Sequence, residues 1–194
     1  MKKMKNSKIL AIALVSIFTF SSCSDDEKPV PVVEEEVITT VTAVYTPVEG
    51  GTQITLKSRD LDGNGSNPPI VTFSGKFAQG KTYNGVVTFL NEMVNPAEDI
   101  TEEIKELALE HQVFYQKTGG INNIIYADTP SNKDSNGNPV GLESVFTTTG
   151  VATGTITITL KHEPNKSAPN VANGDIKNAE GTTDVEVTFD IVVE

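Results

Sequence analysis

The order of hydrophobic and polar residues along the chain predicts an all-β domain that begins at Val37. Residues 37–45 are rich in β-branched side chains, and after a turn at Pro47–Gly51 residues 53–57 alternate cleanly between apolar and polar. Short runs of the same kind, separated by turn residues, continue to the end of the chain. They predict seven more strands, at residues 70–73, 86–90, 112–116, 122–126, 142–148, 155–160 and 184–191.

One stretch, Asn95 to Glu110, has helical rather than strand periodicity. Ile100 and Ile104 begin an apolar stripe at helical spacing, which predicts one short amphipathic helix. Asp99 stands where it can cap the amino end of this helix. Glu102, three residues later, would complete a capping box.

Nine short strands and one helix predict an immunoglobulin-like or Greek-key β-sandwich of about eight or nine strands. In the alternating strands the threonines should face water and the aliphatic residues the interior. The chain has one cysteine and no tryptophan, so it lacks the Cys-Trp-Cys core of antibody domains. The likeness to an immunoglobulin domain therefore rests on the number of strands.

The amino end has a different pattern. Four lysines in residues 1–8 precede an apolar run, Ile9 to Phe20, that is shorter than the ~20 residues a membrane-spanning helix needs. This is the pattern of a secretory signal peptide, at residues 1–22. Residues 23–36 contain prolines and acidic residues and should form an extended tether. Residues 37–194 then form a single domain.

The residues around Cys23 are typical of a lipid anchor. Ser21-Ser22-Cys23 resembles the lipobox of bacterial lipoproteins, although Phe20 stands where that family usually has Leu, Val or Ile. The resemblance implies cleavage before Cys23 and acylation of its sulfur, which would anchor the protein in the membrane. The alternative is an ordinary signal peptide that happens to precede a cysteine. Acylation is favoured because a lone cysteine in an exported protein has no disulfide partner.

Ser24, Asp25, Asp26 and Glu27 follow directly. They resemble the export signal of surface-exposed lipoproteins in the Bacteroidota, which implies an outer-membrane protein that faces the cell exterior. The alternative interpretation is a solvated acidic linker.

The net charge limits the choice of partners. The chain has 15 basic and 26 acidic residues, for a net charge of −11. Residues 1–22 contain four of the lysines and no acidic residue, so the chain from Cys23 has a net charge of −15. A charge of that sign repels phosphate backbones, and we therefore expect no nucleic-acid partner.

The two histidines are the main candidates for chemistry. His111 lies where the predicted helix meets a strand, and His162 follows an alternating strand on its inward-facing parity. With the neighbouring carboxylates Glu110 and Glu163 they would make a set of ligands suited to Zn²⁺ or another divalent transition metal. The spacing does not show that the histidines meet. Two unrelated capping or hydrogen-bonding histidines are the alternative.

Other acidic residues are better explained without a metal. The run Glu34 to Glu36 is interpreted as a solvated charge run, with metal ligands as the alternative. Asp60-x-Asp62-x-Asn64-Gly65 matches only the first half of a calcium loop, and its twelfth position is Val71 rather than glutamate. Residues 134–138 repeat this half pattern. Both segments are also rich in turn-forming residues, which favours structural turns.

Catalytic motifs are missing. The chain contains no Gly-x-Ser-x-Gly, no phosphate-binding loop, no dinucleotide fingerprint and no His-Glu-x-x-His. The only cysteine is assigned to the anchor, so a thiol nucleophile is not expected. We predict that the protein is not an enzyme, with a hydrolase using an acidic pair as a less favoured alternative.

A wider resemblance covers segments spread over the whole domain. Residues 34–41, 60–65, 83–92, 96–103, 110–112 and 162–166 together resemble a family of small Bacteroidota lipoproteins, often labelled as having a type 1 periplasmic-binding fold and without an established activity. That label implies parallel strands and many helices, so the strand pattern is preferred. We expect a surface lipoprotein that captures a metal ion or small ligand beside an outer-membrane TonB-dependent transporter. A structural or adhesive surface protein is the alternative.

Overall fold

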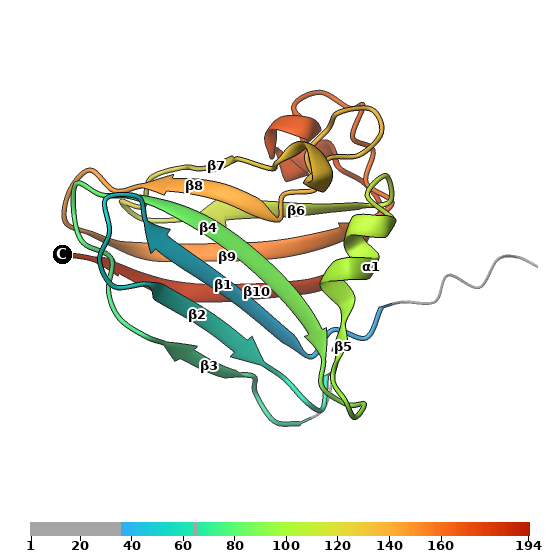
Figure 1. The fold of residues 1–194 in the computed structure, drawn as a ribbon, viewed down its shortest axis with the longest axis horizontal. Coiled ribbons are helices and arrows are strands. Elements are labelled where there is room, and N and C mark those ends of the chain that lie inside the picture. The colour runs from blue at the N-terminus through green and yellow to red at the C-terminus, as the bar shows by residue number, and fades with distance from the viewer. Residues whose placement is uncertain (1–35, 64–65) are drawn as a thin grey trace, which may run out of the picture. The chain divides into compact units, whose positions relative to one another are not determined.

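Two antiparallel β-sheets, packed face to face, make up the fold (Figure 1). The computed structural model describes residues 36–63 and 66–194, all within the compact unit Glu35–Glu194. The larger sheet has seven strands in the order β3-β2-β1-β4-β8-β7, with β5 paired to β4, and the smaller sheet has the order β10-β9-β6. The prediction of an all-β fold with one short helix is confirmed.

Every predicted strand is present, with ends that differ by a few residues, and β5 was not predicted. The strands are β1 (Thr40–Pro47), β2 (Ile54–Arg59), β3 (Ile70–Phe73), β4 (Thr82–Asn91), β5 (Glu98–Asp99), β6 (His111–Lys117), β7 (Ile124–Tyr126), β8 (Glu143–Thr147), β9 (Ala152–His162) and β10 (Thr182–Val193). The helical elements are α1 (Ile100–Glu106) and the 3-10 helices η1 (Pro130–Asn132), η2 (Val171–Asn173) and η3 (Ile176–Asn178).

The core lies between the two sheets and follows the alternation of each strand. In β9 the side chains of Ile156, Ile158 and Leu160 are fully buried. The core includes an aromatic cluster, in which the ring of Phe77 lies 5.3 Å from that of Tyr45 and makes edge-on contact. Such contacts add about 0.5–1.5 kcal/mol each beyond the area they bury.

Helix α1 begins as predicted and ends early. The side chain of Asp99 accepts a hydrogen bond from the Thr101 amide, which confirms the cap. Glu102 does not complete a capping box, because its carboxylate pairs with Lys105 at 2.7 Å. The helix packs its apolar side against β4, where Thr101 is also hydrogen-bonded to the backbone of Phe89.

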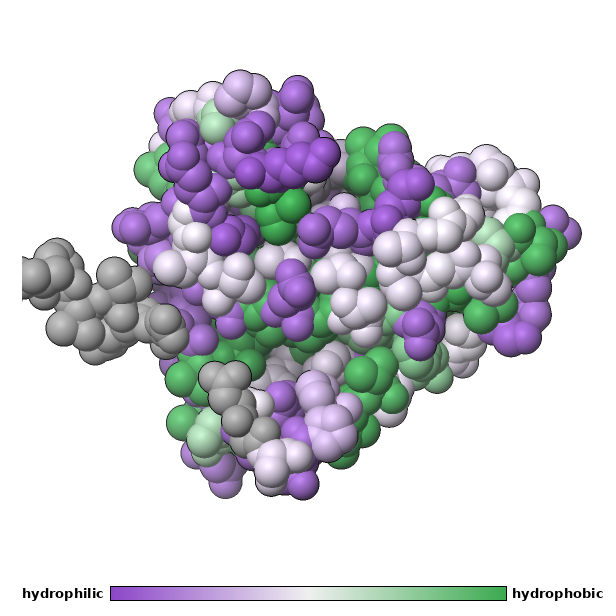
Figure 2. All heavy atoms as spheres, turned by 180° about the vertical axis from the view of Figure 1, so that it is seen from behind, coloured by the Kyte–Doolittle hydropathy of each residue, from purple (hydrophilic) through white to green (hydrophobic). Residues whose placement is uncertain are grey.

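Residues 163–181, which contain η2 and η3, form a lobe on the outer face of the smaller sheet. Phe114 of β6 points outward and packs with Val171 and Ala179 of the lobe in a second, small core. Gln112, also on β6, donates a hydrogen bond to the carbonyl of Val171 at 2.7 Å. Figure 2, seen from behind, shows the lobe as a mostly hydrophilic projection with hydrophobic residues between it and the strands below.

Candidate metal centre

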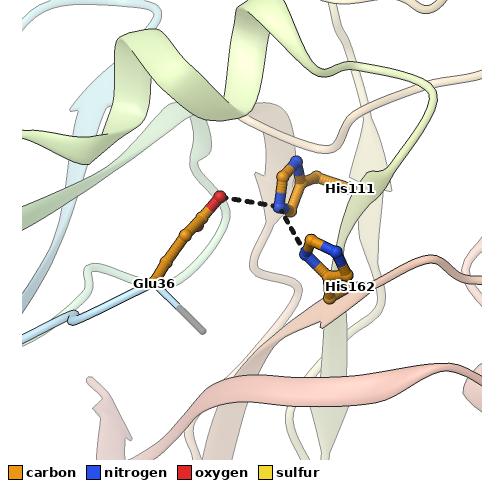
Figure 3. A group of neighbouring side chains, drawn as sticks. All are labelled: Glu36, His111 and His162. Carbon is orange, nitrogen blue, oxygen red and sulfur yellow. Dashed lines mark hydrogen bonds and ion pairs between the residues drawn. The ribbon is translucent and has the colours of Figure 1, made fainter. Parts of the chain in front are cut away.

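His111 and His162 face each other at one end of the smaller sheet. They are directly paired positions of the neighbouring strands β6 and β9, and both side chains lie on the inward face. The Nε2 atom of His111 lies 3.1 Å from Nδ1 of His162, and the ring centroids are 4.9 Å apart (Figure 3). The structure therefore brings together the two histidines whose convergence the sequence left open.

Glu36 completes the group from the other sheet. It lies just before β1, and its Oε1 atom is 2.9 Å from Nε2 of His111 (Figure 3). Only 7% of its side chain is exposed. The ligand atoms of Glu36, His111 and His162 all lie within 4.8 Å of one another. The interpretation of Glu36 as part of a solvated charge run is wrong for this residue, because its side chain turns into the gap between the sheets.

A second carboxylate borders the group. Asp184 lies in β10 at an irregularity of the β9–β10 register, between Thr183 and Val185. A bulge of this kind inserts one residue and redirects its side chain. Its Oδ2 atom lies 4.0 Å from Nε2 of His111, and the side chain is 2% exposed. The regular alternation of this strand would have placed Asp184 outward.

The carboxylates predicted from sequence, Glu110 and Glu163, are not members of this group. Both side chains are exposed. The two residues do meet, but through their backbones, since the Glu163 amide donates to the Glu110 carbonyl at 2.6 Å. Consecutive residues of an extended chain point to opposite faces, so an acidic neighbour of an inward histidine points outward.

The hydrogen bonding of His111 orients its ring. Nδ1 lies 3.2 Å from the carbonyl oxygen of Leu107. A carbonyl can only accept, so Nδ1 carries the hydrogen and Nε2 is the atom that faces Glu36 and His162. Burial by itself lowers the pKa of His111, but the hydrogen bond and charge of Glu36, with the Leu107 carbonyl and Asp184, outweigh it and raise the pKa above its ordinary value.

Negative charge dominates this interior position. Two carboxylates, at most 7% exposed, lie within 4.0 Å of one imidazole nitrogen. The second oxygen of Glu36, Oε2, is buried without a hydrogen-bond partner among the described residues. Buried carboxylates are costly unless a cation or strong donors compensate them. A cation, either a proton on His111 or a metal ion, would compensate the negative charge of these carboxylates.

The donor set fits a borderline transition metal. Two imidazole nitrogens with carboxylate oxygen are common ligands of Zn²⁺, whose bonds of about 2.0–2.2 Å place neighbouring ligand atoms roughly 3.3 Å apart. The two separations from Nε2 of His111, 2.9 and 3.1 Å, need adjustments of only a few tenths of an ångström, and the third, between the ligand atoms of Glu36 and His162, is at most 4.8 Å. Carbonyl-bonded imidazoles are also typical of metal sites, since the carbonyl fixes the tautomer.

A small cavity connects with this group. It has a volume of about 320 Å³, and its lining includes Glu36, Asp184, Asp60 and Gly63. The outward-facing Glu186 of β10 also contributes to its wall. The buried carboxylates can therefore be reached from an acidic recess.

In the described residues, the two half calcium loops form hydrogen-bonded turns, while Asn64 and Gly65 of the first loop lie outside the described residues. Oδ1 of Asp134 accepts the amides of Asn136 and Asn138 at 2.9 Å, and its Oδ2 lies 3.3 Å from the ammonium of Lys166. Lys166 also donates to the Ala108 carbonyl at 2.6 Å, which ties the lobe to the end of the helix. In the other segment, Oδ2 of Asp62 accepts the amide of the Asn67 backbone at 3.2 Å.

Comparison with known proteins gave no match to any protein family, curated protein or solved structure. In the part of the chain that the structure describes, no helix is both long and apolar enough to cross a membrane. The predicted signal peptide (residues 1–22), the acylated Cys23, the export signal Ser24–Glu27 and most of the tether lie outside the described residues. Lipid anchoring and surface display stay predictions from the sequence.

Proposed function

We propose that this protein is a metal-binding module of the cell surface that holds a divalent transition metal, with Zn²⁺ the best fit, at Glu36, His111 and His162. The observation that carries the proposal is the convergence of these three ligand atoms within 4.8 Å in a largely buried position. They come from three separate parts of the chain, and the register of β6 and β9 pairs the two histidines directly. A bound cation would also compensate the second oxygen of Glu36, Oε2, which is buried without a hydrogen-bond partner among the described residues.

The ion would join the two sheets. Glu36 leads into β1 of the larger sheet, whereas His111 and His162 belong to the smaller sheet. Binding of metal to the folded chain alone would stabilise the sandwich, because the unfolded chain does not hold the three ligands together. The acidic recess beside Glu36 and Asp184 gives a route for exchange, which favours capture of a metal over a permanently enclosed ion.

The proposed location comes from the amino-terminal residues. An acylated Cys23 would anchor the protein in the outer membrane, and Ser24 to Glu27 would direct it to the exterior. The metal centre begins at Glu36, where the acidic tether ends. A metal-binding domain held this way would suit an accessory role beside an outer-membrane TonB-dependent transporter.

Metal analysis tests the proposal directly. The mature lipoprotein, purified in detergent, should bind one equivalent of Zn²⁺ in calorimetric titration after removal of bound metal. The variants His111→Ala, His162→Ala and Glu36→Gln should each weaken binding by at least about 100-fold, since each loses a direct ligand.

Two exposed glutamates next to the histidines provide matched controls. Glu110→Gln and Glu163→Gln remove the same charge as Glu36→Gln but lie outside the group, and they should bind Zn²⁺ as the parent does. Absence of stoichiometric Zn²⁺ binding, or equal effects of Glu36→Gln and the two controls, would overturn the assignment of the site.

A further inference from the structure

A second and larger cavity lies on the side of the sandwich where the edge strands β6 and β7 approach each other. Its volume is about 1130 Å³, and it is closed on one side by the segment of η2 and η3. It shares no lining residue with the metal centre or with the recess beside it. Ligand-binding clefts commonly enclose roughly 300–1,000 Å³, so the space suffices for a small molecule.

Three lysines that line this cavity differ from the other basic residues of the described chain in their lack of hydrogen-bond and ion-pair partners. Six basic side chains form ion pairs with carboxylates, and Lys161 donates to the Gly181 carbonyl and to Thr183. The remaining three are Lys117, Lys133 and Lys177, whose side chains form no hydrogen bond or ion pair with the residues that the structure describes. All three line the same cavity.

The acidic side chains of the cavity are already engaged. The carboxylate of Asp128 accepts the amides of Gly141, Leu142 and Glu143 at 2.9 to 3.1 Å. Asp175 caps η3 by accepting the amide of Lys177 at 3.1 Å. These carboxylates therefore accept hydrogen bonds from backbone amides and form no ion pair with the described lysines that line the cavity.

The hydroxyl groups of the two tyrosines that line the cavity also form hydrogen bonds. The hydroxyl of Tyr115 donates to the Gly141 carbonyl at 2.7 Å, and that of Tyr126 donates to the Val113 carbonyl at 2.6 Å. Their rings lie 6.2 Å apart and form an apolar part of the wall. The polar groups left without partners are thus mainly donors, and they are cationic in a chain of net charge −11.

We propose that this cavity binds a small anion that carries two or more carboxylate or phosphate groups, held by Lys117, Lys133 and Lys177. The three lysines come from the end of β6, from the residue after η1 and from η3, so they approach the space from different elements. Separate point charges of this kind suit a ligand with several anionic groups better than one with a single charge. The rings of Tyr115 and Tyr126 would pack against its carbon skeleton.

Two probes distinguish the two possible anionic groups: citrate for carboxylates and pyrophosphate for phosphates. Binding to the metal-free lipoprotein is measured by calorimetry in low-salt buffer, because exposed charges are screened at high ionic strength. At least one probe should bind 10-fold or more tightly than acetate and inorganic phosphate. Tight binding of citrate alone would assign a carboxylate ligand, and tight binding of pyrophosphate alone a phosphate ligand.

The lysines are tested by a triple variant with a matched control. Lys117→Gln/Lys133→Gln/Lys177→Gln should weaken the tighter probe at least 10-fold. Lys57→Gln/Lys76→Gln/Lys105→Gln changes the net charge equally, but its lysines pair with carboxylates elsewhere, and it should bind as the parent does. Failure of both probes to exceed acetate and phosphate, or equal losses in the two triple variants, would overturn the proposal. His162→Ala should leave anion binding unchanged, which separates this site from the metal centre.

Discussion

The Nε2 atom of His111 lies 3.1 Å from the Nδ1 atom of His162, although 51 residues separate them in the chain. Their approach is set by the register of β6 and β9, in which they are a directly opposed pair. A pair fixed by strand register stands on a rigid part of the fold and needs little reorganisation to bind an ion. Glu36 then approaches the same nitrogen from the start of the other sheet.

Zinc should stabilise the metal-free protein in a pH-dependent manner. At 100 times its dissociation constant, a ligand that binds only the folded state adds about 2.7 kcal/mol. The gain should be present at pH 8 and shrink as the pH falls through the pKa of His111, which lies above the ordinary histidine value, because a protonated imidazole cannot bind metal. Scanning fluorimetry from pH 5 to pH 8 would measure it.

Magnesium is the control for this experiment, since it prefers oxygen ligands and should give no comparable gain. An equal rise in unfolding temperature with Mg²⁺, or a zinc effect as large at pH 5 as at pH 8, would contradict binding through the imidazoles.

The sequence predicted the fold well because most of these strands alternate and because turn residues separate them. The inward parity of His162 followed from the same alternation, since Leu160 two residues earlier is apolar and buried. The pairing of His162 with His111 could not be predicted, because register across distant strands depends on how the whole sheet packs. The local pattern therefore predicted the face of His162, but neither its partner nor the face of His111.

The two carboxylates of the centre were missed for different reasons: for Glu36 metal binding was only the less favoured alternative, and Asp184 was not considered. Glu36 is the last of three consecutive glutamates, and only its position just before β1 distinguishes it from a solvated charge. Asp184 begins a run with good alternation, which predicts an outward side chain. The irregularity at Thr183 and Val185 changes its direction, and no residue type in this stretch indicates it.

Asp184→Asn should weaken Zn²⁺ binding by about 10-fold. The carboxylate lies 4.0 Å from His111 Nε2, where it either joins the ion or adds negative charge beside it. Asp190→Asn is the matched control, because Asp190 lies on the same strand with an exposed side chain. Calorimetry of both variants beside the parent gives the comparison, and an equal effect of the two would refute a role for Asp184 in the centre.

Asp134→Asn should destabilise the protein at neutral pH by on the order of 3 kcal/mol, because Lys166, with a side chain only 6% exposed, would lose its counter-charge. Burial raises the pKa of Asp134, but the Asn138 amide and the charge of Lys166 outweigh it and hold the pKa below the ordinary 3.8. Since the folded pKa is depressed, this stabilisation is present above pH 3.8 and is lost as the pH falls through the folded pKa.

Urea unfolding at pH 7, 4 and 2.5 tests this expectation. The difference in free energy of unfolding between parent and Asp134→Asn should be largest at pH 7 and smallest at pH 2.5. A difference that is constant with pH would show that the ionised carboxylate does not contribute.

Gly85→Ala should destabilise the sandwich by about 1–3 kcal/mol through overpacking. Gly85 lies in β4, where an added methyl carbon would come within 2.5 Å of the Ser144 hydroxyl oxygen and within 2.8 Å of the ring of Tyr45, a fully buried residue. Gly150→Ala is the control, because nothing lies within 4 Å of the corresponding position. Thermal unfolding of the two variants should differ clearly, and equal unfolding temperatures would show that the Tyr45 ring can move aside.

Surface display can be tested on intact cells of the source organism. Protease added outside should degrade the parent protein, while a periplasmic marker stays intact to show that the outer membrane is closed.

Cys23→Ser should remove the protein from the membrane fraction, because acylation at the sulfur is lost. Replacing Asp25, Asp26 and Glu27 with alanine should leave the protein membrane-bound but protected, since only the export signal changes. Full protection of the parent protein would refute surface display, and membrane retention of Cys23→Ser would refute the lipid anchor.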